Sequence, residues 1–233
     1  MYKLNLIPRI MVIGIMLVLL LGGCASVVEY GYSLWDSIFG EEQEKTAAEL
    51  MSEGTEKLQK GKYEEAAEAF QKLKDRYPYS QYAVAAELKM ADALYNKEEF
   101  DSAFEAYDEF ERLHPKNRDI PYVIYQKGRC YFRQITTIDR DQSYTRKAKE
   151  EFERLVKRFP RHEYANRARK KIRKCLIYLA EYELYVGHYY FKMGNYKAAM
   201  ERYTYIIQNY PDMGQYNEAL NYISKCKEKL SEK

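Results

Sequence analysis

Residue types that carry catalysis are present in this 233-residue chain, but their spacing forms no recognised catalytic or metal-binding pattern. The sequence contains no HExxH, Walker, GxGxxG or GxSxG motif. His114 stands just before Pro115, where it is expected to pack at a helix end, and neither His162 nor His188 has an identifiable partner in the sequence. The sequence therefore predicts a binding protein, not an enzyme, and it predicts no metal and no cofactor.

Cys24 is the residue with the most informative surroundings. The basic residues Lys3 and Arg9 precede an uncharged apolar run, residues 10–21, which is too short to cross about 30 Å of hydrocarbon as a helix and is typical of a signal-peptide core. The run ends in Leu-Gly-Gly-Cys at residues 21–24 and resembles the lipobox of bacterial lipoproteins. This resemblance implies that residues 1–23 are a signal peptide and that Cys24 becomes the lipidated first residue. The alternatives are a short membrane anchor, or an ordinary signal followed by a chance cysteine.

The residues after Cys24 bear on where the protein is anchored. A lipidated cysteine with three acyl chains holds a protein firmly on a membrane, whereas a single chain binds only marginally. Ala25 and Ser26 follow the cysteine, and the absence of Asp there implies, by the same resemblance, the outer membrane. Residues 24–45 are expected to form a lipidated tether, and residues 46–233 the folded domain.

Composition excludes two further classes of protein. The chain has 38 Lys and Arg against 35 Asp and Glu, whereas nucleic-acid binding usually needs a clear cationic excess. Its 46% hydrophobic residues are too many for a wholly disordered protein, and its 25 tyrosines suggest a core of rings with one polar end. Cys130, Cys175 and Cys226 are an odd number for an oxidising compartment, so at least one is free or pairs with another chain. Buried apolar packing is their expected role.

A pattern of an aromatic residue, Ala, a second aromatic residue and Pro recurs four times, with steps of three, four and eight residues. An apolar residue three positions after the second aromatic extends this pattern into one face of an α-helix. A small residue, Gly54, Ala91 or Gly187, stands twelve residues before the Ala in three copies, where a preceding helix should cross closely. The third copy has Thr145 in place of the first aromatic, and its small residue, Gly128, lies eight residues farther upstream. We therefore expect a lengthened turn around residues 135–143.

These offsets resemble tetratricopeptide repeats, in which each helix pair buries its apolar face only by stacking on its neighbours. The predicted fold is all-α, a superhelical array of tetratricopeptide-like helix pairs with about four and a half repeats. Thr46 and Glu49 can form a capping box, and Pro stops each second helix. The first helix of the fourth copy should run from about residue 163 to residue 193, either continuously or with a kink near Gly187.

Stacked repeats present a concave groove, and the residues just after each small crossing residue should line it. Asn and Tyr side chains there can bond an extended peptide backbone, while aromatic rings hold its side chains. The alternative is that these residues only pack between repeats. The candidates are Thr55, Gln59, Asp92, Tyr95, Asn96, Arg129 and Phe132, with Tyr122 and Tyr125 on the turn before the third repeat.

The segment from residue 161 to residue 174 contains seven basic residues and one Glu. Such a segment is either a solvated helix face or a docking face for an acidic partner domain. Under the docking interpretation Arg167, Lys170 and Lys171 are the candidate contacts.

Four local sequences make the resemblance more specific. Residues 76–82, 119–128, 139–141 and 182–190 resemble the BamD (ComL-like) outer-membrane assembly lipoproteins, and the likeness covers essentially all of the mature chain. It implies a periplasm-facing scaffold subunit of the machinery that assembles β-barrel proteins. It also implies two partners, which are unfolded outer-membrane proteins at the amino-terminal repeats and a BamA-like core barrel subunit at the carboxy-terminal repeats.

The docking turn of that family often carries Arg, whereas the matching turn of this chain, residues 192–195, contains none. The matching candidates here are Lys192, Met193, Asn195 and Tyr196. The docking surface is still expected, but not the particular salt bridge. Two other functions stay open, a pilotin-like lipoprotein for a secretin and a periplasmic repeat protein that regulates cell-wall synthesis.

Lipidation at Cys24 gives the first prediction. The Cys24→Ala variant should accumulate as an uncleaved or mislocalised precursor, because no acceptor for the lipid remains, whereas Cys130→Ala should mature normally. Mass spectrometry of the mature amino terminus measures this directly. An unmodified amino terminus at another residue would contradict the lipoprotein assignment.

Overall fold

The computed structural model describes residues 44–232. The chain divides into two units, residues 1–46 and residues 47–233, and only the second is described in full apart from its last residue. Cys24, the predicted signal peptide and most of the predicted tether lie outside the described residues. Their assignments therefore stay predictions.

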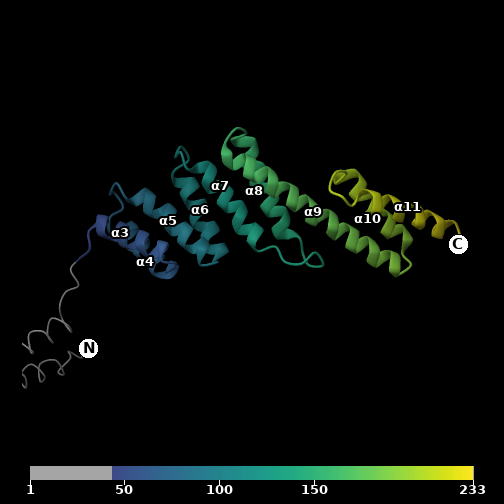
Figure 1. Cartoon of the computed structure of the whole chain (residues 1–233), viewed down its shortest axis with the longest axis horizontal. Helices are drawn as coiled ribbons and strands as arrows, with labels where there is room; N and C mark the ends of the chain where they lie inside the picture. The colour runs from purple at the N-terminus through teal and green to yellow at the C-terminus, as the bar shows by residue number, and fades with distance from the viewer. Residues whose placement is uncertain (1–43, 233) are drawn as a thin grey trace, which may run out of the picture. The chain divides into compact units, whose positions relative to one another are not determined.

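The second unit is built from helices and the turns that join them (Figure 1). Consecutive helices pack side by side as the pairs α3–α4, α5–α6, α7–α8 and α9–α10, and α11 packs on α10. This arrangement confirms the predicted all-α, superhelical array of tetratricopeptide-like repeats, with α11 as the half-repeat. The helices are α3 (Ala47–Gln59), α4 (Tyr63–Arg76), α5 (Ala83–Asn96), α6 (Phe100–Leu113), α7 (Ile120–Arg133), α8 (Ser143–Arg158), α9 (Glu163–Lys192), α10 (Tyr196–Asn209) and α11 (Tyr216–Ser231).

The second helix of every pair ends in the same way. A ring-bearing residue follows the helix and precedes the Pro, and its backbone N–H donates to the carbonyl four residues earlier at 2.8–2.9 Å. Because Pro disfavours the helical region for the residue before it, these residues leave the helix with φ between −124° and −134°. The four residues are Tyr77, His114, Phe159 and Tyr210.

The small residues lie where the two helices of a pair cross, as predicted. A Cβ added at Gly54 would lie 2.6 Å from Phe70, and the same distance separates a Cβ at Gly128 from Phe152. Gly187 faces Tyr203 at 2.6 Å in the same way. These second aromatic residues of the pattern are fully buried, so no side chain larger than hydrogen fits between each glycine and its ring.

The lengthened turn of the third repeat, residues 134–142, is bonded to the start of α8 through Gln142. Gln142 is buried there, and its amide donates to the carbonyls of Thr137 and Arg140 at 3.4 and 3.0 Å. The hydroxyl of Thr145 donates to Gln142 Oε1 at 2.7 Å. This bond explains why a hydroxyl replaces the aromatic ring in the third copy.

The start of α7 differs from the sequence-based expectation, and the length of α9 decides between the two forms that were expected for it. Tyr122 and Tyr125 lie inside α7 and not on the turn before it, because α7 already begins at Ile120 with Pro121 in its first turn. The predicted long helix is one helix of 30 residues, α9, and Gly187 lies within it.

The three described cysteines are free and fully buried, in agreement with their predicted packing role. Burial raises the pKa of the Cys130 and Cys175 thiols to about 12. Their thiols are therefore protonated and unreactive at neutral pH.

The crossing of α3 and α4 gives a stability prediction. Gly54→Ala should destabilise the domain by about 1–3 kcal/mol through overpacking against Phe70, although Ala is the better helix former. Phe70→Leu removes part of the ring, so the double variant should lose less stability than the sum of the two single variants. Chemical denaturation of all three proteins measures this. A wild-type unfolding midpoint for Gly54→Ala would show that the register is wrong.

Candidate functional site

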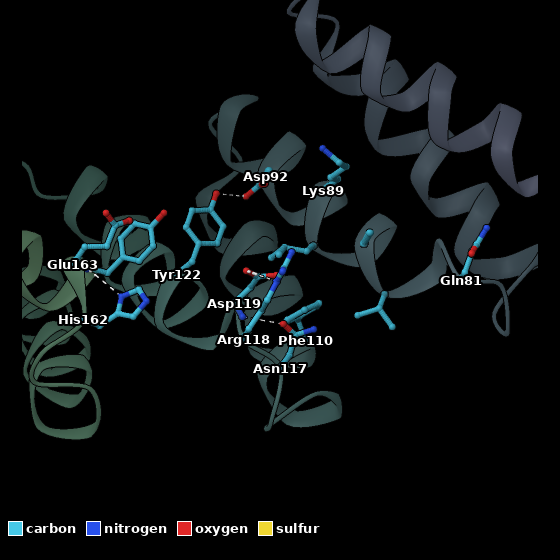
Figure 2. A pocket seen from close by; sticks show the side chains of 14 residues that line it. Gln81, Lys89, Asp92, Phe110, Asn117, Arg118, Asp119, Tyr122, His162 and Glu163 are labelled. Atoms are coloured by element: carbon cyan, nitrogen blue, oxygen red, sulfur yellow. Dashed lines mark hydrogen bonds and ion pairs between the residues drawn. The ribbon is translucent and has the colours of Figure 1, made fainter.

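A hollow of about 940 Å³ lies across α5, the turn between α6 and α7, and the start of α9. Figure 2 shows Tyr122 turned toward Asp92 in its middle, with Gln81 on one side and His162 and Glu163 on the other. Its apolar lining comes from Val84, Ala85, Leu88, Phe110, Tyr122 and Tyr164, and its polar lining from Gln81, Lys89, Asp92, Asn117, Arg118, Asp119, His162 and Glu163. The lining thus combines an apolar surface with charges of both signs.

A second hollow, of about 470 Å³, follows the exposed face of α3. Thr55 and Gln59, two of the candidate groove residues, line it together with Met51, Ser52 and Tyr82. The hydroxyl of Thr55 donates to the carbonyl of Met51 at 2.7 Å, so part of its bonding capacity is used inside the helix. Both hollows lie along first helices of repeats, which is where the concave groove was expected.

Asp92 is the centre of a hydrogen-bond network between the second and third repeats. Its Oδ1 atom accepts from the hydroxyls of Tyr107 at 2.5 Å and Tyr122 at 2.6 Å. The amide of Gln126 donates to the same two hydroxyl oxygens, at 3.2 and 2.9 Å. Burial raises the pKa of Asp92, and burial together with the carboxylate raises the pKa of both tyrosines. Asp92 therefore fixes one wall of the larger hollow instead of standing free for a ligand.

Two predicted groove residues belong to the core. Tyr95 is 6% exposed and Tyr125 is 8% exposed, and both pack in the cluster shared by the second and third repeats. The prediction that their rings are open to a peptide is wrong, because helices of the adjacent repeat cover them. Asn96, at the end of α5, is exposed.

Arg129 and Phe132 lie farther along α7. The Arg129 guanidinium stacks 4.5 Å from the centre of the Tyr95 ring and donates to Gln126 Oε1 at 2.8 Å. The Phe132 ring stacks on Tyr178 with centroids 6.4 Å apart. These residues lie outside both hollows.

The basic segment of α9 presents two different faces. Arg167 and Lys170 are exposed, and Arg167 stacks 5.0 Å from the Tyr164 ring and lies 3.8 Å from Glu163. Lys171 instead points at α7, with its Nζ atom 3.9 Å from the centre of the Phe132 ring. Lys171 was predicted to dock a partner with the other two, and the structure separates it from them.

The turn between α9 and α10 contains the remaining predicted docking residues. Lys192 and Met193 are exposed, and Met193 keeps 66% of its surface. Asn195 caps α10 by accepting from the N–H of Ala198 at 3.3 Å, and Tyr196 packs edge-on against Phe191. Asn195 and Tyr196 thus have structural roles in this turn.

An exposed stripe on α9 was missed by the sequence reasoning. Tyr185 and Tyr189 are about half exposed and align with Met193 at steps of four residues. At 3.6 residues per turn the stripe lies opposite Gly187, whose side of the helix packs on α10. The sequence shows the four-residue spacing. The packing of Gly187 against α10 is what shows that Tyr185 and Tyr189 lie on the exposed side of the helix.

The histidines for which the sequence offered no partner have partners in the fold. His188 Nδ1 lies 2.8 Å from the Tyr203 hydroxyl, and its Nε2 lies 3.2 Å from Glu218 of α11. His162 caps α9 by accepting from the N–H of Tyr164 at 3.3 Å. Among residues 44–232 no cluster of His, Cys, Asp and Glu is suited to hold a metal ion.

Comparison with known proteins assigns the chain to a family. The model of the YfiO family, described as outer membrane lipoprotein, matches residues 43–233. The chain belongs to the YfiO family. The match confirms the family resemblance that the local sequences of the repeats carry, and it agrees with an outer-membrane location. Within the described part of this YfiO protein, no helix is both long and apolar enough to cross a bilayer.

Three relatives share the name BamD. The outer membrane protein assembly factor BamD of Rickettsia prowazekii is 33% identical over 93% of this YfiO chain and 80% of its own. BamD of Caulobacter vibrioides is 29% identical over 91% of this chain and 68% of its own. BamD of Neisseria meningitidis serogroup B is 31% identical over 81% of this chain and 74% of its own.

The raised pKa of Asp92 gives a prediction about pH. Because the folded protein holds this proton more tightly than the unfolded chain, the free energy of unfolding should fall as pH rises from the ordinary value of 3.8 through the raised pKa. Asp92→Asn cannot ionise and lacks this decline. Its stability relative to wild type should therefore improve as pH rises above about 4, as thermal melting at several pH values would show. Asp212→Asn, in an exposed turn, serves as the control, and an equal pH trend in both variants would contradict the prediction.

Proposed function

We propose that this protein is a non-catalytic scaffold subunit of the machinery that assembles β-barrel proteins in the outer membrane. In this proposal it binds unfolded barrel proteins and the core barrel subunit. The observation that carries it is the pair of hollows, one on α3 and one across α5 and the start of α9, in a chain whose relatives are named outer membrane protein assembly factors. The lipid on Cys24 would hold this face at the periplasmic side of the membrane.

The larger hollow suits an extended segment of an unfolded barrel. Such a segment has apolar side chains on alternate positions and backbone N–H and C=O groups without partners. Val84 and Leu88 offer apolar contact, while Gln81 and Asn117 offer amides that bond a backbone from the rim. Ordering the segment costs roughly 1–2 kcal/mol per residue, so the affinity should be modest, on the order of micromolar. Modest affinity allows the client to be passed on.

The exposed stripe on α9 supports docking of the core subunit at the other end of the array. Tyr185, Tyr189 and Met193 are exposed at steps of four residues, and tyrosine is a frequent anchor in protein interfaces. Lys192, which is exposed next to Met193, can add electrostatic steering toward an acidic domain. The two binding functions would then use different surfaces of one scaffold.

Affinity capture of the full lipidated chain from solubilised envelopes tests both functions in one experiment. Wild type should recover the core barrel subunit and unfolded barrel proteins. Val84→Glu places a charge in the hollow, so it should recover about tenfold less barrel protein, a change of about 1.4 kcal/mol, and a normal amount of core subunit. Tyr189→Glu combined with Met193→Glu should show the reverse pattern.

Leu113→Glu is the matched control, because Leu113 is exposed but lies outside both hollows and outside the stripe. It should recover both partners as wild type does. Recovery of a secretin or of wall-synthesis enzymes in place of the barrel machinery would contradict the proposal and favour a pilotin or a wall regulator.

A further inference from the structure

Cations gather on aromatic rings between α7 and α9 without an acidic partner. Lys171 lies 3.9 Å from the centre of the Phe132 ring and makes neither a hydrogen bond nor an ion pair within residues 44–232. Arg129 lies 4.5 Å from the Tyr95 ring centre, and its one hydrogen bond in the same range is to the neutral amide of Gln126. Both cations are therefore held in place by rings and neutral groups, not by carboxylates.

The charges at this place act on one another. Partial burial lowers the pKa of Lys171, and the positive charges of Lys174, Arg129 and Arg133 lower it further. Arg133 is paired with Glu98, but Arg129, Lys171 and Lys174 are not paired with any acid that the described chain supplies. An incoming anion would relieve this repulsion, and the ring contacts already fix the donors, so little freedom is lost on binding.

The cations lie on the path of a peptide that occupies the larger hollow. Tyr122 lines that hollow, and Gln126 bonds both Tyr122 and Arg129. Seven residues along α7 separate Tyr122 from Arg129, which is a rise of about 10 Å or three residues of extended chain. A peptide that leaves the hollow along α7 therefore meets Arg129 and Lys171 within a few residues.

We propose that Arg129 and Lys171 form a subsite for a carboxylate of the bound peptide. The carboxylate is either the C-terminus of the peptide or an acidic side chain near it. Arg offers a planar pair of donors that matches a carboxylate, and Lys adds a point charge. Phe132 and Tyr178, packed on one another beside Lys171, offer apolar contact to the neighbouring peptide residue. This inference rests on the proposed peptide-binding function and specifies which group of the client is recognised.

The test uses the full mature chain and one labelled peptide from the terminal strand of a barrel protein in three forms. These forms have a free C-terminal acid, a C-terminal amide, or a C-terminal amide with Glu next to it. On wild type, at least one of the two carboxylate forms should bind about tenfold tighter than the plain amide. The form that binds tightly identifies the source of the carboxylate.

The variants separate the subsite from general electrostatics. Lys171→Gln should abolish the difference between acid and amide forms, whereas Lys170→Gln, which removes an exposed charge one residue away, should preserve it. Equal binding of all three forms to wild type would overturn the subsite and leave the proposed function standing. Equal melting of wild type and Val84→Glu shows that both proteins are folded. If folded wild type then binds none of the three forms, the proposed peptide-binding function fails and the subsite with it.

Discussion

The contact of a small residue with a fully buried ring is the constraint on which the rest of the array depends. At Gly54, Gly128 and Gly187 the helix backbone lies directly on Phe70, Phe152 and Tyr203, and any side chain there would meet the ring at 2.6 Å. The crossing sets how closely the two helices of a pair approach. Because each helix packs mainly on its neighbours in sequence, this spacing also sets where the next pair lies, and with it the width of the hollows along the first helices.

The crossing ring also determines the polar residue beside it. In the second and fourth repeats the ring is a tyrosine, Tyr107 or Tyr203, and its hydroxyl bonds the residue just after the small one, Asp92 or His188. In the first and third repeats the ring is Phe and carries no hydroxyl. Each of these tyrosines packs its ring in the core and bonds a polar side chain through its hydroxyl. In the second repeat this bond links the core to Asp92 on the groove wall. The large share of tyrosine in the composition is consistent with this use of one side chain for two contacts.

Local pattern and long-range packing explain what could and could not be predicted from the sequence. Helix ends at Pro, the glycine crossings and the lengthened turn depend on residues close in sequence, and they are where the pattern placed them. The exposure of Tyr95 and Tyr125 depends on which helix of the next repeat covers them, and no local spacing reports that. The larger hollow extends along α5 from Val84 to Asp92, and its far side is formed by His162 and Tyr164 at the start of α9, which no local spacing predicts. Lys171 faces Phe132 for the same reason, since α9 runs on past α7.

Hydrogen–deuterium exchange tests most directly whether the larger hollow is the client site. It is measured on the mature protein with and without a peptide from the terminal strand of a barrel protein. The lining residues of α5 and the turn before α7, residues 81–92 and 117–122, should exchange more slowly when the peptide is bound. The stripe of α9 from residue 185 to residue 193 should be unchanged, because it is proposed to serve another partner. Protection confined to that stripe, with none along α5, would contradict the assignment of the groove.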